Sequence, residues 1–213
     1  MTITDHKELK AKDTGRKELL IKIALERFAK YGYHKTKISD IVGEAGVAQG
    51  TFYWYFKSKE ALVLEIIRNG QEQLLQVIGQ GYRKEVGTVE DMLRSSEELL
   101  TGFFRFAFAN RHFMEIMLSG SGWDETIRQA AHEARVSMEL AFRRNIRRAI
   151  ELGMLPDTMD VEVRSALLMS LIEGIAARWL FGPLEAGSQI PERTPEELAA
   201  ETARFEFFGL LGK

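Results

Sequence analysis

Apolar residues recur at intervals of three and four along almost the whole chain of 213 residues. Leu20, Ala24 and Phe28 form one such stripe, and residues 38–42 continue the pattern. This spacing places apolar side chains on one face of an α-helix. No segment alternates apolar and polar residues for longer than about four positions, whereas a half-buried strand requires such alternation. The pattern therefore predicts an all-α protein.

Local start and stop signals divide this pattern into separate helices. Gly32 supplies a left-handed stop after the first stripe, and Ser58 can cap the fourth helix. Thr194, Pro195 and Glu197 combine a cap, a first-turn proline and a capping box. We expect helices near residues 14–31, 37–45, 48–55, 58–82, 88–109, 112–118, 124–152, 160–181 and 194–211.

Five consecutive aromatic residues, Phe52-Tyr53-Trp54-Tyr55-Phe56, occupy the third of these helices. At about 100° per residue, Phe52 and Phe56 lie one turn apart on one side. Trp54 and Tyr55 fall on the opposite side, and Tyr53 lies on a flank. Because a short helix cannot bury all five rings, we expect Phe52 and Phe56 in the core and the others at the surface.

Two short helices separated by a tight turn are the arrangement of a DNA-binding helix-turn-helix, in which the second helix projects into the major groove. The segment from about residue 16 to 67 resembles the N-terminal signature of the tetracycline-repressor (TetR) family of bacterial transcription regulators. The resemblance rests on Gly32-Tyr33, Thr36, Asp40-Ile41, Ala45-Gly46-Val47, Gly50-Thr51, Tyr53, Phe56 and Lys59-Glu60. It implies a DNA-binding domain at residues 14–74, with the helix-turn-helix at about 37–56.

The resemblance and the chemistry of the side chains together indicate which residues contact DNA. Gln49 can pair with an adenine edge, Gly50 allows the backbone to approach the duplex, and Thr51 can donate to a phosphate. Relatives often have a basic or larger polar residue where this chain has Ser39 and Ala48. The predicted set of contact residues is Lys37, Ser39, Ala48, Gln49, Gly50, Thr51, Tyr53, Trp54, Tyr55, Lys57 and Lys59.

The charge distribution agrees with an anionic partner near the N-terminus. Residues 1–60 contain 12 Lys and Arg against 8 Asp and Glu, whereas the rest of the chain contains 17 against 23. The first part therefore has a net charge of +4 and the remainder −6. A basic bias confined to one end favours a nucleic-acid partner there.

Composition disfavours several other classes of protein. The chain has no cysteine, which excludes disulfides, thiolate catalysis and cysteine-ligated metal centres. The polar N-terminus lacks the apolar core of a secretory signal, and Glu173 and Arg178 interrupt the apolar run 166–181, so we expect a cytoplasmic protein without a membrane span. The four histidines are scattered, and no phosphate-binding glycine loop or nucleophile elbow is present, so we expect neither enzyme activity nor a cofactor.

The resemblance implies a ligand-binding and dimerisation domain at residues 75–213. Two-fold dimers pair helices that are apolar on more than one face, so we expect a homodimer formed through about residues 161–181 and 194–211. Bulky apolar residues between 103 and 123 indicate either a cavity for a small apolar or aromatic effector or a well-filled core. The predicted pocket residues are Phe103, Phe104, Phe108, His112, Glu115, Met117, Trp123, Met169 and Glu173.

Polar residues in this region have alternative interpretations. His112 and Glu115, three positions apart, could share a metal ion, but no third ligand is evident and a local interaction is favoured, so we expect no metal. Glu173 could lie at the floor of a pocket, or it could be a buried structural acid that pairs with an arginine.

Together these patterns favour a homodimeric transcriptional repressor that a small-molecule effector releases from a palindromic operator on double-stranded DNA. Two alternatives stay open at this level. One is a TetR-like activator or co-regulator whose effector is a protein. The other is a helical metal-binding protein or enzyme that uses His112 and Glu115.

Overall fold

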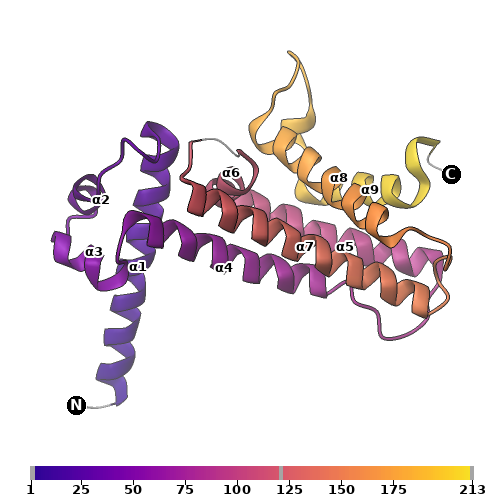
Figure 1. The fold of residues 1–213 in the computed structure, drawn as a ribbon, viewed down its shortest axis with the longest axis horizontal. Coiled ribbons are helices and arrows are strands. Elements are labelled where there is room, and N and C mark those ends of the chain that lie inside the picture. Colours follow the sequence, from indigo (N-terminus) through magenta and orange to yellow (C-terminus); the bar gives the residue numbers. More distant parts are fainter. Residues whose placement is uncertain (1–2, 120–121, 212–213) are drawn as a thin grey trace. The chain divides into compact units, whose positions relative to one another are not determined.

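The computed structural model describes residues 3–119 and 122–211. Within these ranges the chain forms helices and no strand, which confirms the all-α prediction (Figure 1). The elements are α1 (Ile3–Tyr31), α2 (Ile38–Glu44), α3 (Gln49–Tyr55), α4 (Lys59–Gly79), α5 (Val89–Ala109), α6 (Arg111–Ser119), α7 (Glu125–Glu151), α8 (Val161–Phe181) and α9 (Pro195–Phe208), with short 3-10 helices at Ile190–Glu192 and Gly209–Leu211.

Contacts divide the described residues into two compact units. The first lies within residues 1–68 and 119–130, and the second within residues 69–118 and 131–213. The boundary falls inside α4, at the end of α6 and inside α7, so the start of α7 groups with the N-terminal helices. The domain boundary that the sequence predicts near residue 74 stays a prediction.

The core of the first unit takes one face from each of its helices. Leu20, Ala24 and Phe28 of α1 are buried, as are Ile41 of α2 and Phe52 of α3. Helix α2 packs against both α1 and α3. Burial of one large apolar side chain contributes about 1.5–3 kcal/mol. The short helices are therefore stabilised by this shared core rather than by their own length.

Two glycines with left-handed backbone close the turns of the first unit. Gly32 (φ 87°) follows α1, and its N–H donates to the carbonyl of Phe28 at 2.9 Å. Gly46 (φ 67°) lies between α2 and α3, and the next residue, Val47, donates its N–H to the carbonyl of Val42 at 3.0 Å. A side chain is strained at such φ values, so glycine is favoured at both turns. Both turns agree with the sequence prediction.

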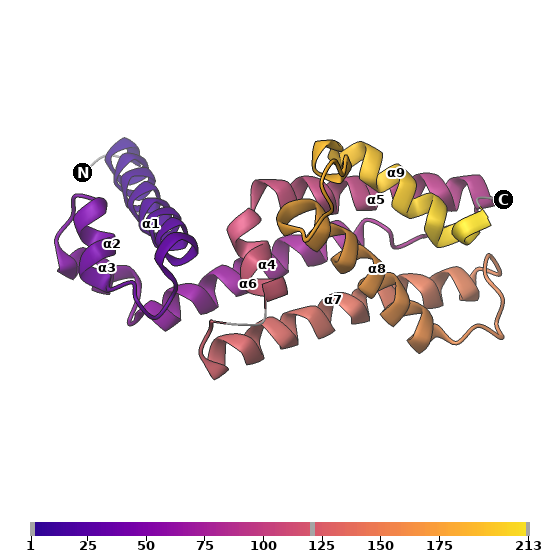
Figure 2. The same ribbon diagram turned by 90° about the horizontal axis from the view of Figure 1, so that it is seen from above.

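The second unit is a helical bundle in which α9 packs along α5 (Figure 2). Phe103 and Phe104 of α5 are fully buried, and Trp179 of α8 meets the ring of Phe104 edge to face, with centroids 6.0 Å apart. The start of α9 has the predicted capping box. The hydroxyl of Thr194 accepts the N–H of Glu197 at 3.2 Å, and the Glu197 carboxylate accepts the N–H of Thr194 at 2.9 Å.

Some helix ends differ from the predicted ones. Helix α1 begins at Ile3 rather than near residue 13 or 14, because the residues before that point include Lys, Glu, Leu and Ala, which favour helix. Helix α4 ends at Gly79 rather than at Tyr82. In the part of the chain that the structure describes, no helix combines the length and the apolar character needed to span a bilayer.

Candidate nucleic-acid interface and ligand cavity

Helix α3 divides its aromatic residues between the core and the surface. Phe52 and Phe56 have exposed fractions of 0% and 2%, and their ring centroids lie 5.5 Å apart. Tyr53 and Trp54, in contrast, are 51% and 80% exposed. The interleaved arrangement expected from helical periodicity is therefore present. One face of α3 anchors the helix, and the other presents aromatic and polar groups to solvent.

The remaining predicted DNA-contact residues surround this exposed face. Ala48, Gln49 and Gly50 at the start of α3 are exposed, and Thr51 and Tyr55 are half-buried. A hollow of about 540 Å³ connects the start of α3 with the start of α2, and it is lined by His34, Thr36, Lys37, Ile38, Ser39, Gln49 and Lys59. Six of these seven residues have polar or charged side chains, and such groups suit a phosphate backbone or a base edge.

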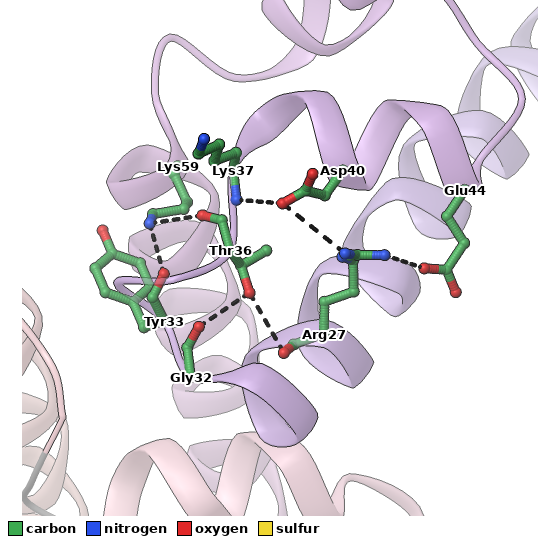
Figure 3. Close-up of polar contacts among 8 residues, drawn as sticks. All are labelled: Arg27, Gly32, Tyr33, Thr36, Lys37, Asp40, Glu44 and Lys59. Atoms are coloured by element: carbon green, nitrogen blue, oxygen red, sulfur yellow. Dashed lines mark hydrogen bonds and ion pairs between the residues drawn. The ribbon is translucent and has the colours of Figure 1, made fainter.

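Hydrogen bonds fix the backbone that leads into α2 (Figure 3). The hydroxyl of Thr36 donates to the carbonyl of Gly32 at 2.9 Å. The backbone N–H of Lys37 donates to the carboxylate of Asp40 at 2.9 Å, and the guanidinium of Arg27 lies 3.8 Å from the same carboxylate. At Lys37 the contact uses the backbone N–H, and the side chain of this residue is exposed.

Lys59 has a structural position that the sequence does not reveal. Its ammonium group donates to the carbonyls of Tyr33 at 2.6 Å and Thr36 at 3.0 Å, and it lies 4.1 Å from the centroid of the Tyr33 ring (Figure 3). Burial lowers the pKa of Lys59, and the carboxylate of Asp124 opposes this change. Two of the three ammonium donors are thus already used inside the protein. The phosphate contact predicted for Lys59 stays a prediction, and the residue also stabilises the α1–α2 turn.

Trp123 lies in the first unit, against Phe28 and Tyr33, with ring centroids 6.1 and 5.2 Å apart respectively. The next residue, Asp124, accepts a hydrogen bond from the phenol of Tyr33 and lies 3.7 Å from the imidazole of His34. Burial and the Asp124 carboxylate raise the pKa of the Tyr33 phenol. The sequence prediction that Trp123 lines a ligand pocket near Phe103 is therefore wrong. Its ring completes the aromatic core behind the α1–α2 turn.

The second unit contains a cavity of about 870 Å³. It lies among α5, α7, α8 and α9, and its lining is mainly apolar, with Leu100, Phe142, Leu168 and Phe207 among the contributing residues. Gly81 and Arg83, which follow α4, also line it. Small-molecule sites have volumes of about 300–1,000 Å³ and are lined in this way. The volume and the lining of this cavity therefore fall within the range of such sites.

None of the nine predicted pocket residues lines this cavity. They are used instead in the core, in ring contacts or in ion pairs. Phe103, Phe104, Met117 and Met169 are buried core residues, and Phe108 is 64% exposed and stacks on Trp179. The apolar cluster at residues 103–117 is therefore a filled core, which is the second of the two interpretations of the sequence.

The polar members of the predicted pocket also form local pairs. Glu173 forms a bidentate ion pair with Arg135, with one Nε–oxygen distance of 2.6 Å, so the interpretation as a paired structural acid is confirmed. The imidazole Nδ1 of His112 lies 3.8 Å from the carboxylate of Glu115. Among the described residues, no group of three or more acidic, histidine or cysteine side chains is positioned to hold a metal ion.

The cavity-lining residues were not apparent from the sequence because they are ordinary members of apolar stripes. Leu99, Leu100 and Phe142 repeat at helical spacing as core residues do. Glu206, an acid between two phenylalanines near the end of α9, departs from that pattern. A charged residue in an apolar segment is a signal that could have directed attention to this region.

Comparisons with known proteins agree with these features. A family model described as "Bacterial regulatory proteins, tetR family" matches residues 20–66. The chain is 31% identical over 180 residues to the uncharacterized HTH-type transcriptional regulator YvdT of Bacillus subtilis (strain 168), covering 79% of this chain and 84% of that protein. It is 23% identical over 205 residues to the regulator YdgC of the same organism, covering 96% and 97% respectively.

Similarity to solved structures extends over both units. The crystal structure of the transcriptional regulator FadR from Bacillus subtilis in complex with stearoyl-CoA matches with a TM-score of 0.71 and 20% identity, covering 91% of this chain and 98% of that one. At this level of identity the likeness shows the fold, an N-terminal helix-turn-helix followed by a helical domain.

Proposed function

Since the chain belongs to the TetR family of bacterial transcription regulators, we propose that it is a ligand-responsive repressor that binds a palindromic operator as a homodimer. The observation that carries this proposal is the division of α3, with Phe52 and Phe56 buried and Tyr53 and Trp54 exposed. Large exposed aromatic side chains on a short, firmly anchored helix cost solubility and add nothing to the core. A nucleic-acid surface accounts for them.

In this proposal residues 14–74 bind DNA, and α3 of each subunit enters the major groove. Gln49 and Gly50 approach the base edges, and Tyr53 and Trp54 contact phosphates and thymine methyl groups. Lys37 and Lys57 are exposed and contact the phosphate backbone without sequence preference. Lys59 adds its remaining donor there.

The homodimer is proposed to form through α8 and α9, within residues 75–213. Val163 and Leu167 on α8 are 51% and 57% exposed, and Phe205 on α9 is 42% exposed. Apolar side chains gathered on two neighbouring helices are typical of a surface that a partner covers. A two-fold pairing of these helices would bury them in a four-helix interface.

Release from DNA is proposed to begin in the cavity of the second unit. Gly81 and Arg83 line this cavity directly after the end of α4, and α4 begins directly after the α3 segment. A ligand that prefers a different position of the α4 end therefore changes the separation of the two reading helices. The relative FadR binds stearoyl-CoA, which supports an effector with a long apolar part.

The first experiment is selection of bound sequences from a random duplex pool, followed by anisotropy titration on the selected site. We expect a palindrome whose half-site centres lie about one helical turn apart or slightly more, roughly 34–36 Å. Tyr53→Ala should weaken binding, whereas Tyr82→Ala, a control tyrosine with the same 51% exposure outside the helix-turn-helix, should not. A folded Tyr53→Ala protein with unchanged affinity for the site would refute the assignment of α3.

The release mechanism has its own test. The two N-terminal segments of a dimer are crosslinked at the spacing they adopt on the selected operator, and release by an effector is then measured. The crosslinked protein should stay bound when the effector is added. Normal release from the crosslinked protein would contradict a mechanism based on the separation of the reading helices.

A further inference from the structure

The cavity of the second unit contains a carboxylate that the proposed function does not use. Glu206 of α9 lines the cavity, and its carboxylate accepts a hydrogen bond from the hydroxyl of Ser96 on α5 at 2.5 Å. By accessible surface Glu206 is an exposed residue, although desolvation of its carboxylate by the neighbouring protein raises the pKa of that group. An ionised carboxylate in an apolar lining is costly unless a positive or hydrogen-donating group approaches it.

The two arginines that also line the cavity do not neutralise this carboxylate. The guanidinium of Arg83 donates to the carbonyl of Asp91, and its charge acts on the Asp91 carboxylate. Arg164, in the first turn of α8, is exposed to solvent. Across residues 15–118 and 122–211, where side chains are described, Glu206 forms no ion pair. Its carboxylate is therefore the cavity's available partner for a positively charged head group.

We propose that this cavity binds an amphiphile with a protonated amine head group, whose N–H groups donate to the carboxylate of Glu206 while its hydrocarbon part occupies the apolar lining. The apolar part is built from residues such as Leu99, Leu100, Phe142, Leu168, Leu171 and Phe207. The inference rests on the proposed effector role of the cavity and specifies its ligand class. A charge-assisted hydrogen bond is stronger than one between neutral groups, which gives the head group its selectivity.

The test compares three probes with the same ten-carbon chain and different head groups, namely decylammonium, decanoate and 1-decanol. Binding to the full-length protein is measured by isothermal titration calorimetry below the micelle concentrations. We expect decylammonium to bind at least about tenfold more tightly than decanoate, because the Glu206 carboxylate attracts the ammonium group and repels the carboxylate of decanoate. Glu206→Gln should abolish this preference and leave the affinity for decanol within about twofold.

Two control variants separate the carboxylate from the fold of α9. Glu201→Gln removes an exposed carboxylate on the same helix, outside the cavity lining, and should keep the full preference for decylammonium. Ser96→Ala removes the hydroxyl and keeps the carboxylate, so the preference should persist. Far-UV circular dichroism and melting confirm that each variant is folded before the ratios are compared.

The outcomes distinguish this inference from the proposed function. Equal or tighter binding of decanoate, or an unchanged ratio in folded Glu206→Gln, would overturn the amine assignment. If decanoate or decanol binds and releases DNA, the effector role of the cavity stands and only the head-group class is wrong. If none of the three probes binds, both the amine assignment and the effector role of this cavity are wrong, and the DNA-binding tests are unaffected.

Discussion

The aromatic residues of α3 allow a direct comparison of a stabilising and a reading side chain two positions apart. Phe56 is 2% exposed and packs on Phe52, whereas Trp54 is 80% exposed. Truncation of a fully buried Phe to Ala costs about 3–5 kcal/mol, because the transfer free energy and the cavity penalty add. That is a large fraction of the roughly 5–15 kcal/mol that stabilises a typical domain. We therefore expect Phe56→Ala to unfold the first unit or to leave it marginally stable.

Trp54→Ala should have the opposite effect. Because only about a fifth of the Trp54 side chain is covered, its buried apolar area is on the order of 50 Å², which corresponds to about 1 kcal/mol. The stability of the first unit should therefore change little. Loss of a specific base contact costs about 1–3 kcal/mol, so operator affinity should fall by roughly 5- to 150-fold for each subunit contact.

Two measurements test this pair of variants. Hydrogen–deuterium exchange of peptides from residues 20–66 reports the local opening free energy of the first unit, independently of the second unit. Fluorescence anisotropy on the selected operator reports affinity, and a salt titration separates phosphate contacts from base contacts. The division of the helix into an anchoring and a reading face would be refuted by either of two results. One is a loss of several kcal/mol in the opening free energy of the first unit in Trp54→Ala, and the other is an unchanged opening free energy in Phe56→Ala.

Three further predictions follow from individual contacts. Lys59→Met keeps the aliphatic contact with Tyr33 but removes two charged donors to backbone carbonyls, so it should lower the opening free energy of the first unit by about 1–2 kcal/mol, whereas Lys57→Met, at an exposed site, should not. Thr194→Ala removes the cap of α9 and should cost about 1 kcal/mol in urea denaturation. Because burial raises the pKa of Glu206 above its unfolded value, its contribution to folding is fully present below the unfolded pKa and is lost as pH rises through the folded pKa. The melting temperature of Glu206→Gln should therefore exceed that of the parent protein by an amount that grows as pH increases from 4 towards neutrality. A difference in melting temperature that does not change with pH would contradict this.

Local sequence signals determined the order and type of the helices. Apolar periodicity, Gly32 and Gly46 at the turns and the capping box at Thr194 act within a few residues, so they can be interpreted without knowledge of the fold. The same reasoning separated the buried Phe52 from the exposed Trp54, because the angle between residues of one helix is fixed by its geometry.

The tertiary structure alone decided which faces meet and where space is left between them. Trp123 lies nearly a hundred positions from Phe28, and nothing in its local pattern indicates that the two rings share a core. The sequence around Lys59 does not distinguish it from a surface lysine. Only the fold shows that the α1–α2 turn places two carbonyls at its ammonium group. The cavity beside Glu206 arises in the same way. Periodicity specifies that a helix face is apolar, but only the packing of α5, α7, α8 and α9 determines whether that face is filled or lines a hollow.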